Sequence, residues 1–430
     1  MINRAIPPLI HPIESFSLPK PRCETLSNGV PVFYFDNPYS ELVYVLLQVH
    51  TGSLFQPAKH VCNFAYTLLR ESSPSLSPEE TAERLDFNGA NVSVNVGLEW
   101  VQVVISAPRR NLSSIMPVIA DFLVNPIYRA DNLRIMQDKE VKNLAYNSQK
   151  TDFVSWQLMW NTLFADVFPG VAELSTSDTI NSLEISQLQE FYKRSFCAEN
   201  ISVFVTGNIG DGDERVISEA FSPIPGGIPS PSLPQVPSQP AGSDIVYRPM
   251  AGCLQSSVIL CQVSDGYNHP DRTAFSVLNT LTGGYFSSRL MQNLRERQGL
   301  TYGVSSSSTY FGNQSVFAIS SDVNAAQTAH AIDSAFEELQ RLQDEVVGDE
   351  ELNMVKNYMA GIQLRSVDTS VSTMQKYAFF HRFGLDESEM YRYLSSVRET
   401  TPEEILNLAK KYFTNNKFTR IVVGNYLAEK

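Results

Sequence analysis

Residues 140–149 read EVKNLAYNSQ, and residues 354–363 read MVKNYMAGIQ. The two stretches lie 214 positions apart and share Val, Lys, Asn and Gln in the same order. Three further pairs of segments have this offset and follow the same order along the chain: LLQV at 46–49 with LCQV at 260–263, NG at 88–89 with YG at 302–303, and VVIS at 103–106 with FAIS at 317–320. Four ungapped matches predict that the chain contains a duplicated domain.

A change of composition separates the two copies. Residues 222–243 read SPIPGGIPSPSLPQVPSQPAGS, in which Pro, Gly and Ser dominate and apolar residues show no period. Such a composition is typical of an extended linker. The sequence therefore predicts a first domain at 1–221, a linker at 222–243 and a second domain at 244–430.

Each predicted domain shows the same order of strands and helices. Apolar strand segments come first, a helix follows, and then a pair of alternating segments typical of a β-hairpin, before further helices and a last strand. The strand segments are VPVFYF, ELVYVLLQV, ANVSVNV and WVQVVISA in the first copy, and SSVILCQV, YGVSSSS and SVFAISSD in the second. This order predicts an α+β fold of two homologous sandwich domains.

Composition and charge narrow the class of protein. The chain has 430 residues, 43% of them hydrophobic, and a net charge of −13. Such a composition predicts a folded protein with more than one domain, and the acidic balance argues against a nucleic-acid partner. The five cysteines form no C-x-x-C pair, which favours reduced thiols. No signal peptide or membrane span is predicted, so the expected location is the cytoplasm.

Five segments of the chain are similar to segments of one known family. The most specific is GGYFSSRLMQNLRERQGLTYGVSS at 283–306. The others are LSNGVPVFYFDNP at 26–38, GANVSVNVGLEWVQVVIS at 89–106, FLVNPIYRADNL at 122–133 and TPEEILNLAKKYFTNNKFTRIVVGN at 401–425. They resemble the pitrilysin/insulinase family of zinc peptidases, in its form with two homologous domains per subunit. The resemblance covers most of residues 22–425.

The first domain of that family normally carries an H-x-x-E-H motif on a helix. Its two histidines hold zinc, its Glu acts as general base, and a Glu from a later helix completes the ligands. The matching helix here is HVCNFAYTLLRE at 60–71, which places Asn63 and Thr67 in the histidine positions and Tyr66 in the Glu position. The later ligand falls near 144–147, which reads LAYN. The resemblance therefore implies a degenerate site and no zinc cofactor in this chain.

His60 does not replace the missing ligands. The positions three and four residues after it hold Asn63 and Phe64, and Glu71 lies about 16 Å further along a helix. The other histidines also lack ligand spacing, so isolated structural or surface roles are expected for His11, His50, His269, His330 and His381.

Arg295 and Tyr302 are the candidate functional residues. They lie seven positions apart in LRERQGLTY, where a helix predicted from Ser288 ends near Gly299 and a strand begins. From spacing alone, Arg295 could equally be one charge on a solvated helix end, and Tyr302 a strand aromatic. The resemblance implies that Arg295 fixes peptide carbonyls and that the Tyr302 hydroxyl donates a hydrogen bond to the reacting carbonyl.

The leading hypothesis is a catalytically inactive subunit of a heteromeric zinc peptidase. A homologous partner subunit would supply the zinc and H-x-x-E-H, while this chain would supply Arg295 and Tyr302 and close the peptide chamber. The alternative is a non-proteolytic structural or assembly subunit with the same fold. A third possibility is an independent metallopeptidase with relocated ligands.

Overall fold

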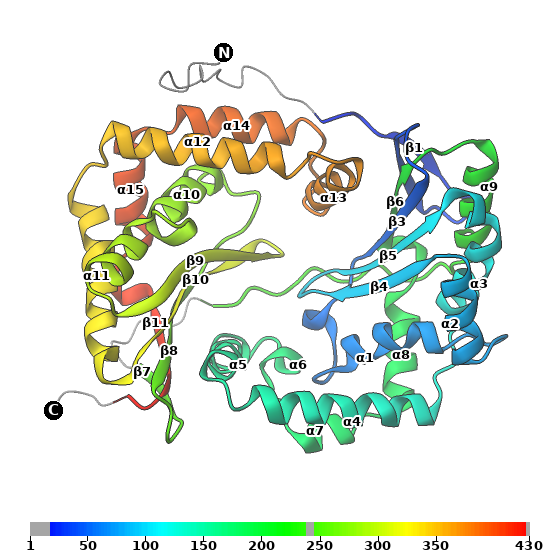
Figure 1. The fold of residues 1–430 in the computed structure, drawn as a ribbon, viewed down its shortest axis with the longest axis horizontal. Helices are drawn as coiled ribbons and strands as arrows, with labels where there is room; N and C mark the ends of the chain where they lie inside the picture. The colour runs from blue at the N-terminus through cyan, green and yellow to red at the C-terminus, as the bar shows by residue number, and fades with distance from the viewer. Residues whose placement is uncertain (1–17, 238–244, 427–430) are drawn as a thin grey trace, which may run out of the picture.

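The computed structural model describes residues 18–237 and 245–426 as two α+β halves lying side by side, each built on one sheet (Figure 1). The α+β class predicted from the sequence is confirmed. Among the described residues, no helix has the length and apolar character needed to cross a bilayer.

The first half contains a six-stranded sheet in the order β1-β2-β6-β3-β5-β4, in which only β2 and β6 run parallel. The strands are β1 (Arg22–Thr25), β2 (Pro31–Asp36), β3 (Leu42–Val49), β4 (Asn91–Val96), β5 (Val101–Pro108) and β6 (Ile201–Gly207). The helices are α1 (Val61–Thr67), α2 (Pro78–Phe87), α3 (Leu112–Val124), α4 (Ala130–Asn147), α5 (Thr151–Phe164), α6 (Pro169–Ala172), α7 (Ser177–Asn181), α8 (Ile185–Ser195) and α9 (Asp211–Phe221), with short 3₁₀ turns η1 (Ser53–Phe55) and η2 (Leu68–Glu71).

The second half contains a five-stranded sheet in the order β7-β11-β8-β10-β9, in which only β7 and β11 run parallel. The strands are β7 (Ile245–Pro249), β8 (Gln255–Asp265), β9 (Thr301–Phe311), β10 (Gln314–Asn324) and β11 (Thr419–Gly424). The helices are α10 (Arg272–Asn279), α11 (Thr328–Asp344), α12 (Asp349–Arg365), α13 (Ser370–His381), α14 (Glu389–Glu399) and α15 (Pro402–Tyr412), with two π-helical segments, η5 (Thr280–Gly284) and η6 (Met291–Arg297).

The two sheets have the same topology once β1 is set aside. In each, a parallel outer pair is followed by a long central strand and an antiparallel hairpin that ends at the sheet edge. Three of the four sequence matches lie on equivalent elements, namely β3 with β8, β5 with β10, and α4 with α12. The repeat read from the sequence is therefore a structural repeat.

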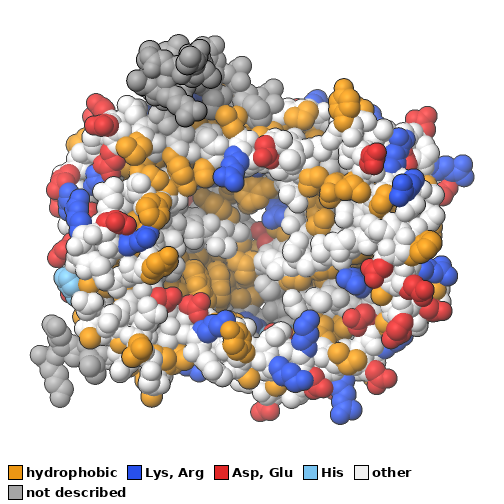
Figure 2. All heavy atoms as spheres, in the orientation of Figure 1, with side chains coloured by type: hydrophobic (Ala, Val, Ile, Leu, Met, Phe, Trp, Pro, Cys, Tyr) orange, Lys and Arg blue, Asp and Glu red, His pale blue; other side chains and the backbone are white. Residues whose placement is uncertain are grey.

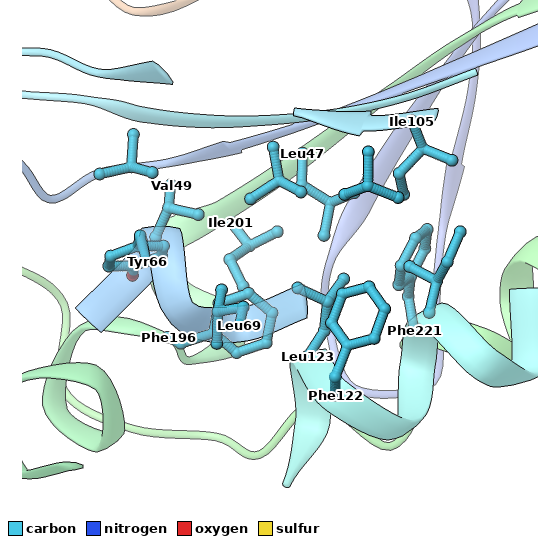
Figure 3. Close-up of a cluster of buried hydrophobic side chains, with 14 of the residues drawn as sticks. Leu47, Val49, Tyr66, Leu69, Ile105, Phe122, Leu123, Phe196, Ile201 and Phe221 are labelled. Atoms are coloured by element: carbon cyan, nitrogen blue, oxygen red, sulfur yellow. The ribbon is translucent and has the colours of Figure 1, made fainter. Parts of the chain in front are cut away.

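The core of the first half lies between its sheet and the helices α1, α3 and α9 (Figure 3). Alternate residues of β5 are buried, as expected for a strand with one covered face. The Figure 3 side chains that fill this layer are Leu47, Val49, Tyr66, Leu69, Ile105, Phe122, Leu123, Phe196, Ile201 and Phe221. Burial of each large apolar side chain contributes about 1.5–3 kcal/mol, so this layer fixes where α1 lies.

The opposite face of each sheet is covered by a helix from the other half. Helix α5 of the first half packs on β8 and β11 of the second. The shared cluster is apolar and fully or nearly buried, and includes Val154, Met159, Leu163, Phe164, Ile259, Cys261, Phe311 and Ile421. Aromatic contact adds to it, because the ring centroids of Phe164 and Phe311 lie 5.4 Å apart.

Helix α13 of the second half makes the reciprocal contact with β2, β3 and β6. Its apolar side chains form a cluster with the first sheet: Phe33, Phe35, Leu46, Phe204, Met374, Tyr377 and Ala378. The buried Gln48 amide donates to the Ala378 carbonyl at 3.1 Å and its oxygen accepts from Arg382 Nε at 2.8 Å. Each sheet is thus sandwiched between its own helices and one exchanged helix (Figure 1).

The segment after α9 is extended but held in place. The Ser230 N–H donates to Asn200 Oδ1 at 2.7 Å, and the Ser230 hydroxyl donates to the His50 carbonyl. Val236 exchanges two hydrogen bonds with the Gln314 side chain, at 2.7 and 2.8 Å. No helix or strand is present from 225 to 237, while 238–243 of the predicted linker lie outside the described residues.

Candidate functional site

Helix α1 is where the family motif would be. The predicted helix at 60–71 is confirmed as α1 followed by η2. Asn63 and Thr67 are exposed, whereas Tyr66 is completely buried. The two positions that the resemblance assigns to zinc ligands therefore carry an exposed amide and an exposed hydroxyl, and the position that it assigns to the base is buried in the core.

Tyr66 has become part of the core. Its hydroxyl shares a 2.9 Å hydrogen bond with the Ser195 hydroxyl, and its ring lies 5.1 Å from the ring of Tyr192. Burial raises the pKa of Tyr66 well above its ordinary value. A phenol in this state is neutral across the physiological range and cannot serve as a base.

His60 has a structural role beside α1. It stands before the helix in the left-handed conformation, with φ of 71°, and its Nε2 lies 2.9 Å from the Ser175 hydroxyl. Burial, together with the neighbouring Lys59 charge, lowers the pKa of His60 to about 4. It is therefore a neutral, hydrogen-bonded side chain.

The residues present do not fit a zinc ion. Positions 144–147 form the last turn of α4 and contain no carboxylate. In the described part of the chain, no three His, Cys, Asp or Glu side chains are grouped so that they could hold a metal. Structural and catalytic zinc sites need at least three such ligands, so the donor chemistry required for zinc is missing around α1.

Arg295 and Tyr302 do lie together. The guanidinium carbon of Arg295 is 5.2 Å from the centroid of the Tyr302 ring and 4.7 Å from that of Phe286. Tyr302 is 87% exposed and Phe286 is 65% exposed. The only ion-pair partner of Arg295 among the described residues is its neighbour Glu296, at 3.5 Å. The side chain of Arg295 is 28% exposed. We call Phe286, Arg295 and Tyr302 the Arg/Tyr cluster.

The backbone between Arg295 and Tyr302 turns tightly at Gly299. This residue has φ of +63°, a conformation that favours glycine. Its N–H donates to the Arg295 carbonyl at 3.1 Å, and the Leu300 N–H donates to the Leu294 carbonyl at 2.8 Å. The predicted helix end at Gly299 is confirmed, and β9 begins two residues later.

The helix that carries Arg295 differs from the prediction in its hydrogen bonding. Met291–Arg297 form a π-helical segment, shown for example by the Gln298 N–H donating to the Asn293 carbonyl at 3.1 Å. Short π-helical segments are often found at functional sites. A second one, η5, lies beneath β9, where Gly283 packs directly against the backbone of Ser306.

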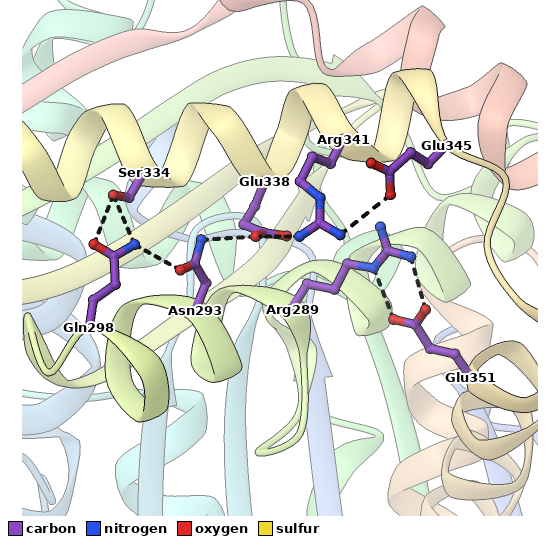
Figure 4. A network of polar contacts seen from close by, with 8 residues as sticks. All are labelled: Arg289, Asn293, Gln298, Ser334, Glu338, Arg341, Glu345 and Glu351. Carbon is purple, nitrogen blue, oxygen red and sulfur yellow. Dashed lines mark hydrogen bonds and ion pairs between the residues drawn. The ribbon is translucent and has the colours of Figure 1, made fainter.

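A polar network holds η6 against α11 and α12 (Figure 4). Arg289 makes a bidentate ion pair with Glu351, with both distances 2.9 Å. Asn293 donates to the nearly fully buried Glu338 at 2.8 Å, and Arg341 donates to the same carboxylate at 3.0 Å. Charge-assisted hydrogen bonds of this kind are strong, and their geometry is specific. Together they fix the orientation of the helix that presents Arg295.

Sequence reasoning missed the contributions of Phe286 and Glu338. Phe286 lies nine positions before Arg295, and only the chain turn before η6 brings its ring over the guanidinium. A charged residue on the apolar face of the helix at 328–344 would have been the one available signal for Glu338.

The molecule is hollowed between its two halves on the face shown in Figure 2, with hydrophobic side chains at the floor of the hollow. A smaller cavity of about 270 Å³ is lined by Gly303 and Ser305 of β9. Its walls come from α5 and from strands β8, β9 and β10, and are rich in hydroxyl groups: Ser155, Ser257, Ser305, Ser320 and Ser321. Side chains alternate along a strand, so this cavity lies on the face of β9 opposite to Tyr302 and is separate from the Arg/Tyr cluster.

Comparisons with known proteins cover nearly the whole chain. Residues 182–359 match the model of the peptidase M16 inactive domain. An uncharacterized zinc protease of Rickettsia felis is 22% identical over 96% of this chain and 99% of its own length. An uncharacterized zinc protease of Mycobacterium leprae is 24% identical over 94% and 92%.

Two solved structures share the fold. The structure of a peptidase M16 inactive domain from Pseudomonas fluorescens superposes with a TM-score of 0.87 at 19% identity, covering 96% of this chain and 99% of that one. A protease from Helicobacter pylori gives a TM-score of 0.83 at 16% identity, covering 95% and 100%. The chain is therefore similar over nearly its whole length to proteins described as zinc proteases, and its residues 182–359 match the peptidase M16 inactive domain.

Proposed function

We propose that this protein is the catalytically inactive partner subunit of a heteromeric zinc peptidase. A homologous subunit supplies the zinc ion with its H-x-x-E-H helix. This chain supplies the Arg/Tyr cluster and one wall of the chamber that receives the peptide. The proposal joins the absence of zinc ligands on α1 to the presence of a guanidinium on η6 and a phenol on β9 that lie side by side.

The observation that carries the proposal is the contrast between the two halves. Asn63, Tyr66 and Thr67 offer no ligand or base, yet Arg295, on a helix anchored by a buried polar network, lies beside Tyr302 of β9. Within the described chain, Arg295 forms an ion pair only with Glu296, and Tyr302 is 87% exposed. A guanidinium and a phenol in this position can bind a peptide carbonyl and stabilise the charge that develops on it.

The test is reconstitution with the homologous zinc-bearing subunit from the same organism. This protein alone should cleave no peptide, and the mixture should cleave a fluorogenic one. Arg295→Ala or Tyr302→Phe should lower kcat of the mixture by about 100-fold, because removing one donor to a developing oxyanion has an effect of this size.

The second half of the chain also offers control variants of the same residue types. Arg297→Ala changes an exposed arginine in the same helix, and Tyr391→Phe changes an exposed tyrosine on α14; neither should alter turnover. Unchanged kcat in Arg295→Ala and Tyr302→Phe would remove the role assigned to them. A stable complex with no peptidase activity would favour the structural or assembly subunit instead.

A further inference from the structure

Helix α12 carries an exposed apolar face in addition to its buried one. The helix lies beside α14 in the second half (Figure 1). Three large apolar side chains on its outer side recur at intervals of four residues: Met354, Tyr358 and Ile362, which are 53%, 40% and 46% exposed. We call these three side chains the α12 row. Contiguous exposed apolar residues of this kind mark interaction surfaces.

The outer side of α12 also lacks charge. Between 352 and 364 its exposed residues are Asn353, Met354, Asn357, Tyr358, Gly361 and Ile362. The one lysine in this stretch, Lys356, is half-buried, and its amine donates to the Arg398 carbonyl of α14 at 2.8 Å. The positions 214 residues earlier, on the equivalent helix α4, include Lys139 and Glu140. The uncharged face is therefore particular to α12 and is not required by the repeated fold.

The α12 row continues the Arg/Tyr cluster. The rings of Tyr358 and Tyr285 lie 5.0 Å apart. Phe286 follows Tyr285 in the chain, and the Arg295 guanidinium lies 4.7 Å from its ring centroid. Aromatic side chains thus lead without a break from the Arg/Tyr cluster onto α12.

The position of the α12 row is fixed before anything binds. Glu351, in the first turn of α12, accepts two hydrogen bonds of 2.9 Å from Arg289, just before η6. The inner side of the helix is held in the core of the second half by Leu352, Val355 and Met359. A preformed surface lowers the entropic cost of binding.

Two exposed amides lie beside the α12 row. Asn353 and Asn357 are the neighbours of Met354 and Tyr358, and neither amide forms a hydrogen bond within the described residues. Each amide offers both donors and an acceptor. Gly361 follows one turn later, and a Cβ added there would meet nothing within 4 Å, so another chain can approach the helix closely. The surface therefore combines apolar contacts with groups that match a peptide backbone.

We propose that this surface of α12 binds an extended peptide segment in which apolar and polar residues alternate. Residues four apart on a helix are separated by about 6.0 Å along its axis, and alternate residues of an extended chain by about 6.6–6.8 Å. Successive apolar side chains of the peptide therefore lie against Met354, Tyr358 and Ile362, while its backbone pairs with Asn353 and Asn357. The inference names the class of peptide received beside the Arg/Tyr cluster, and in that respect it rests on the proposed function.

The amides favour an extended chain over a helix or a lipid. A helix satisfies its own backbone groups except at its ends, and an acyl chain has no such groups, so neither would use Asn353 and Asn357. An extended segment instead carries an unpaired N–H and C=O at each residue. The two amides and the α12 row together thus select a peptide in the conformation of a β-strand.

The experiment measures binding to the full-length chain alone by fluorescence anisotropy. One probe is a fluorescein-labelled octapeptide in which leucine and serine alternate, and the second has the same composition with its four leucines together. The alternating peptide should bind at least about tenfold more tightly, because only its extended form places more than two leucines on one face. Equal affinities, or no saturation up to about 1 mM peptide, would overturn the proposal.

A third probe tests the backbone contacts. The alternating peptide with N-methylated serines keeps its side chains but loses the N–H groups of those residues, and it should bind several-fold more weakly. Asn357→Ala should weaken the unmethylated peptide by a similar factor and leave the methylated one unchanged, because the two changes remove the same contact. A methylated peptide that binds as tightly as its parent would show apolar adhesion only and would contradict the proposal.

The α12 row is tested by the double variant Met354→Ser, Ile362→Ser. Its affinity for the alternating peptide should fall at least about tenfold with little change in Tm, because both side chains are about half exposed. Leu254→Ser, at an 86% exposed leucine between β7 and β8, is the control and should bind normally. A double variant that still binds the peptide but no longer assembles with the zinc-bearing subunit would make this surface a subunit interface and overturn the proposal.

Failure of this inference can be told apart from failure of the proposed function. Reconstitution could fail while the chain alone still prefers the alternating peptide, which would reject only the proposed function. Reconstituted activity that depends on Arg295, with no preference between the two octapeptides in the chain alone, would reject only α12 as a peptide-binding surface.

Discussion

Substitutions at Asn63 and Thr67 should affect stability less than substitutions at Tyr66. Both are exposed on α1 and four positions apart, so new side chains there would meet solvent. Tyr66 is enclosed by the core and bonded to Ser195. Introducing the histidines of H-x-x-E-H at Asn63 and Thr67 should therefore change the free energy of unfolding little. Introducing its Glu at Tyr66 should lower that free energy.

We predict that the double variant Asn63→His, Thr67→His is folded and gains Zn²⁺ affinity, because two histidines four apart on a helix point the same way. Its Tm should rise with zinc concentration, as for any ligand that binds only the folded state. It should hydrolyse nothing, because a third ligand and a base are missing. Asn63→His alone is the control and should respond far less to zinc.

Adding Tyr66→Glu to this double variant should destabilise the fold by at least about 3 kcal/mol, because a carboxylate would be left unpaired in the core. Denaturant unfolding measures this difference. A triple variant as stable as the double variant would show that the core around α1 accepts a charge, contrary to the packing described above.

At the residue scale, the sequence singled out Arg295 and Tyr302, which do lie side by side, while the roles given to them and to Asn63, Tyr66 and Thr67 stay predictions. It did not predict that Phe286 stacks over Arg295, because that contact crosses a turn whose direction depends on tertiary packing. It also did not show that Tyr66 bonds Ser195, which lies 129 positions away. Such contacts leave no local pattern in the chain.

Among the elements, η5 and η6 govern where the Arg/Tyr cluster lies. η5 packs beneath β9, η6 is tied to α11 through Glu338, and Arg289 just before η6 is tied to α12 through Glu351. Their π-helical hydrogen bonding was not predicted from the sequence, since the change from i→i+4 to i→i+5 bonding has no compositional signature. The helix itself and its glycine end were predicted, because capping signals are local.

The close packing of η5 under β9 can be tested by substituting Gly283. A Cβ added there would lie 2.9 Å from the Ser306 backbone nitrogen, so Gly283→Ala should destabilise the protein by about 1–3 kcal/mol. Gly361→Ala, in the exposed interior of α12 with nothing within 4 Å, should instead stabilise it by up to about 1 kcal/mol. Thermal unfolding of both variants measures the contrast, and equal shifts would contradict the close packing of η5 under β9.

At the scale of the whole molecule, the exchange of α5 and α13 joins the two halves. Removing either half would uncover an apolar sheet face, as the cluster of Phe33, Phe35, Leu46 and Phe204 around α13 shows. Exposed apolar patches of this kind drive aggregation. The stability of each half therefore depends on the other.

We predict that residues 1–221 and residues 244–430, produced separately, do not fold into stable monomers. Co-expression of the two should give a soluble complex that elutes at the size of the intact chain. Size-exclusion chromatography and circular dichroism measure these outcomes, with the intact chain as reference. A monomeric 1–221 that unfolds cooperatively would show that α13 is dispensable to the first sheet.

The duplication could be predicted from the constant offset of 214, but the exchange could not. An apolar helix face has the same periodicity whichever sheet covers it. The hydrophobic pattern of α5 therefore does not predict which of the two sheets the helix packs against. The predicted order of strands and helices was enough for the fold class, while the packing of α5 and α13 across the two halves needed the three-dimensional structure.

The helix exchange also bears on how such a chain could arise. A half-length ancestor with one sheet and one exchanged helix would have closed its core only by trading that helix with a second copy, as domain-swapped dimers do. Fusion of two such copies makes the pairing intramolecular, and it frees the two copies from having to carry identical residues. One copy can then lose its metal ligands and the other keep its arginine and tyrosine, a division of labour that a symmetric dimer of identical chains cannot reach.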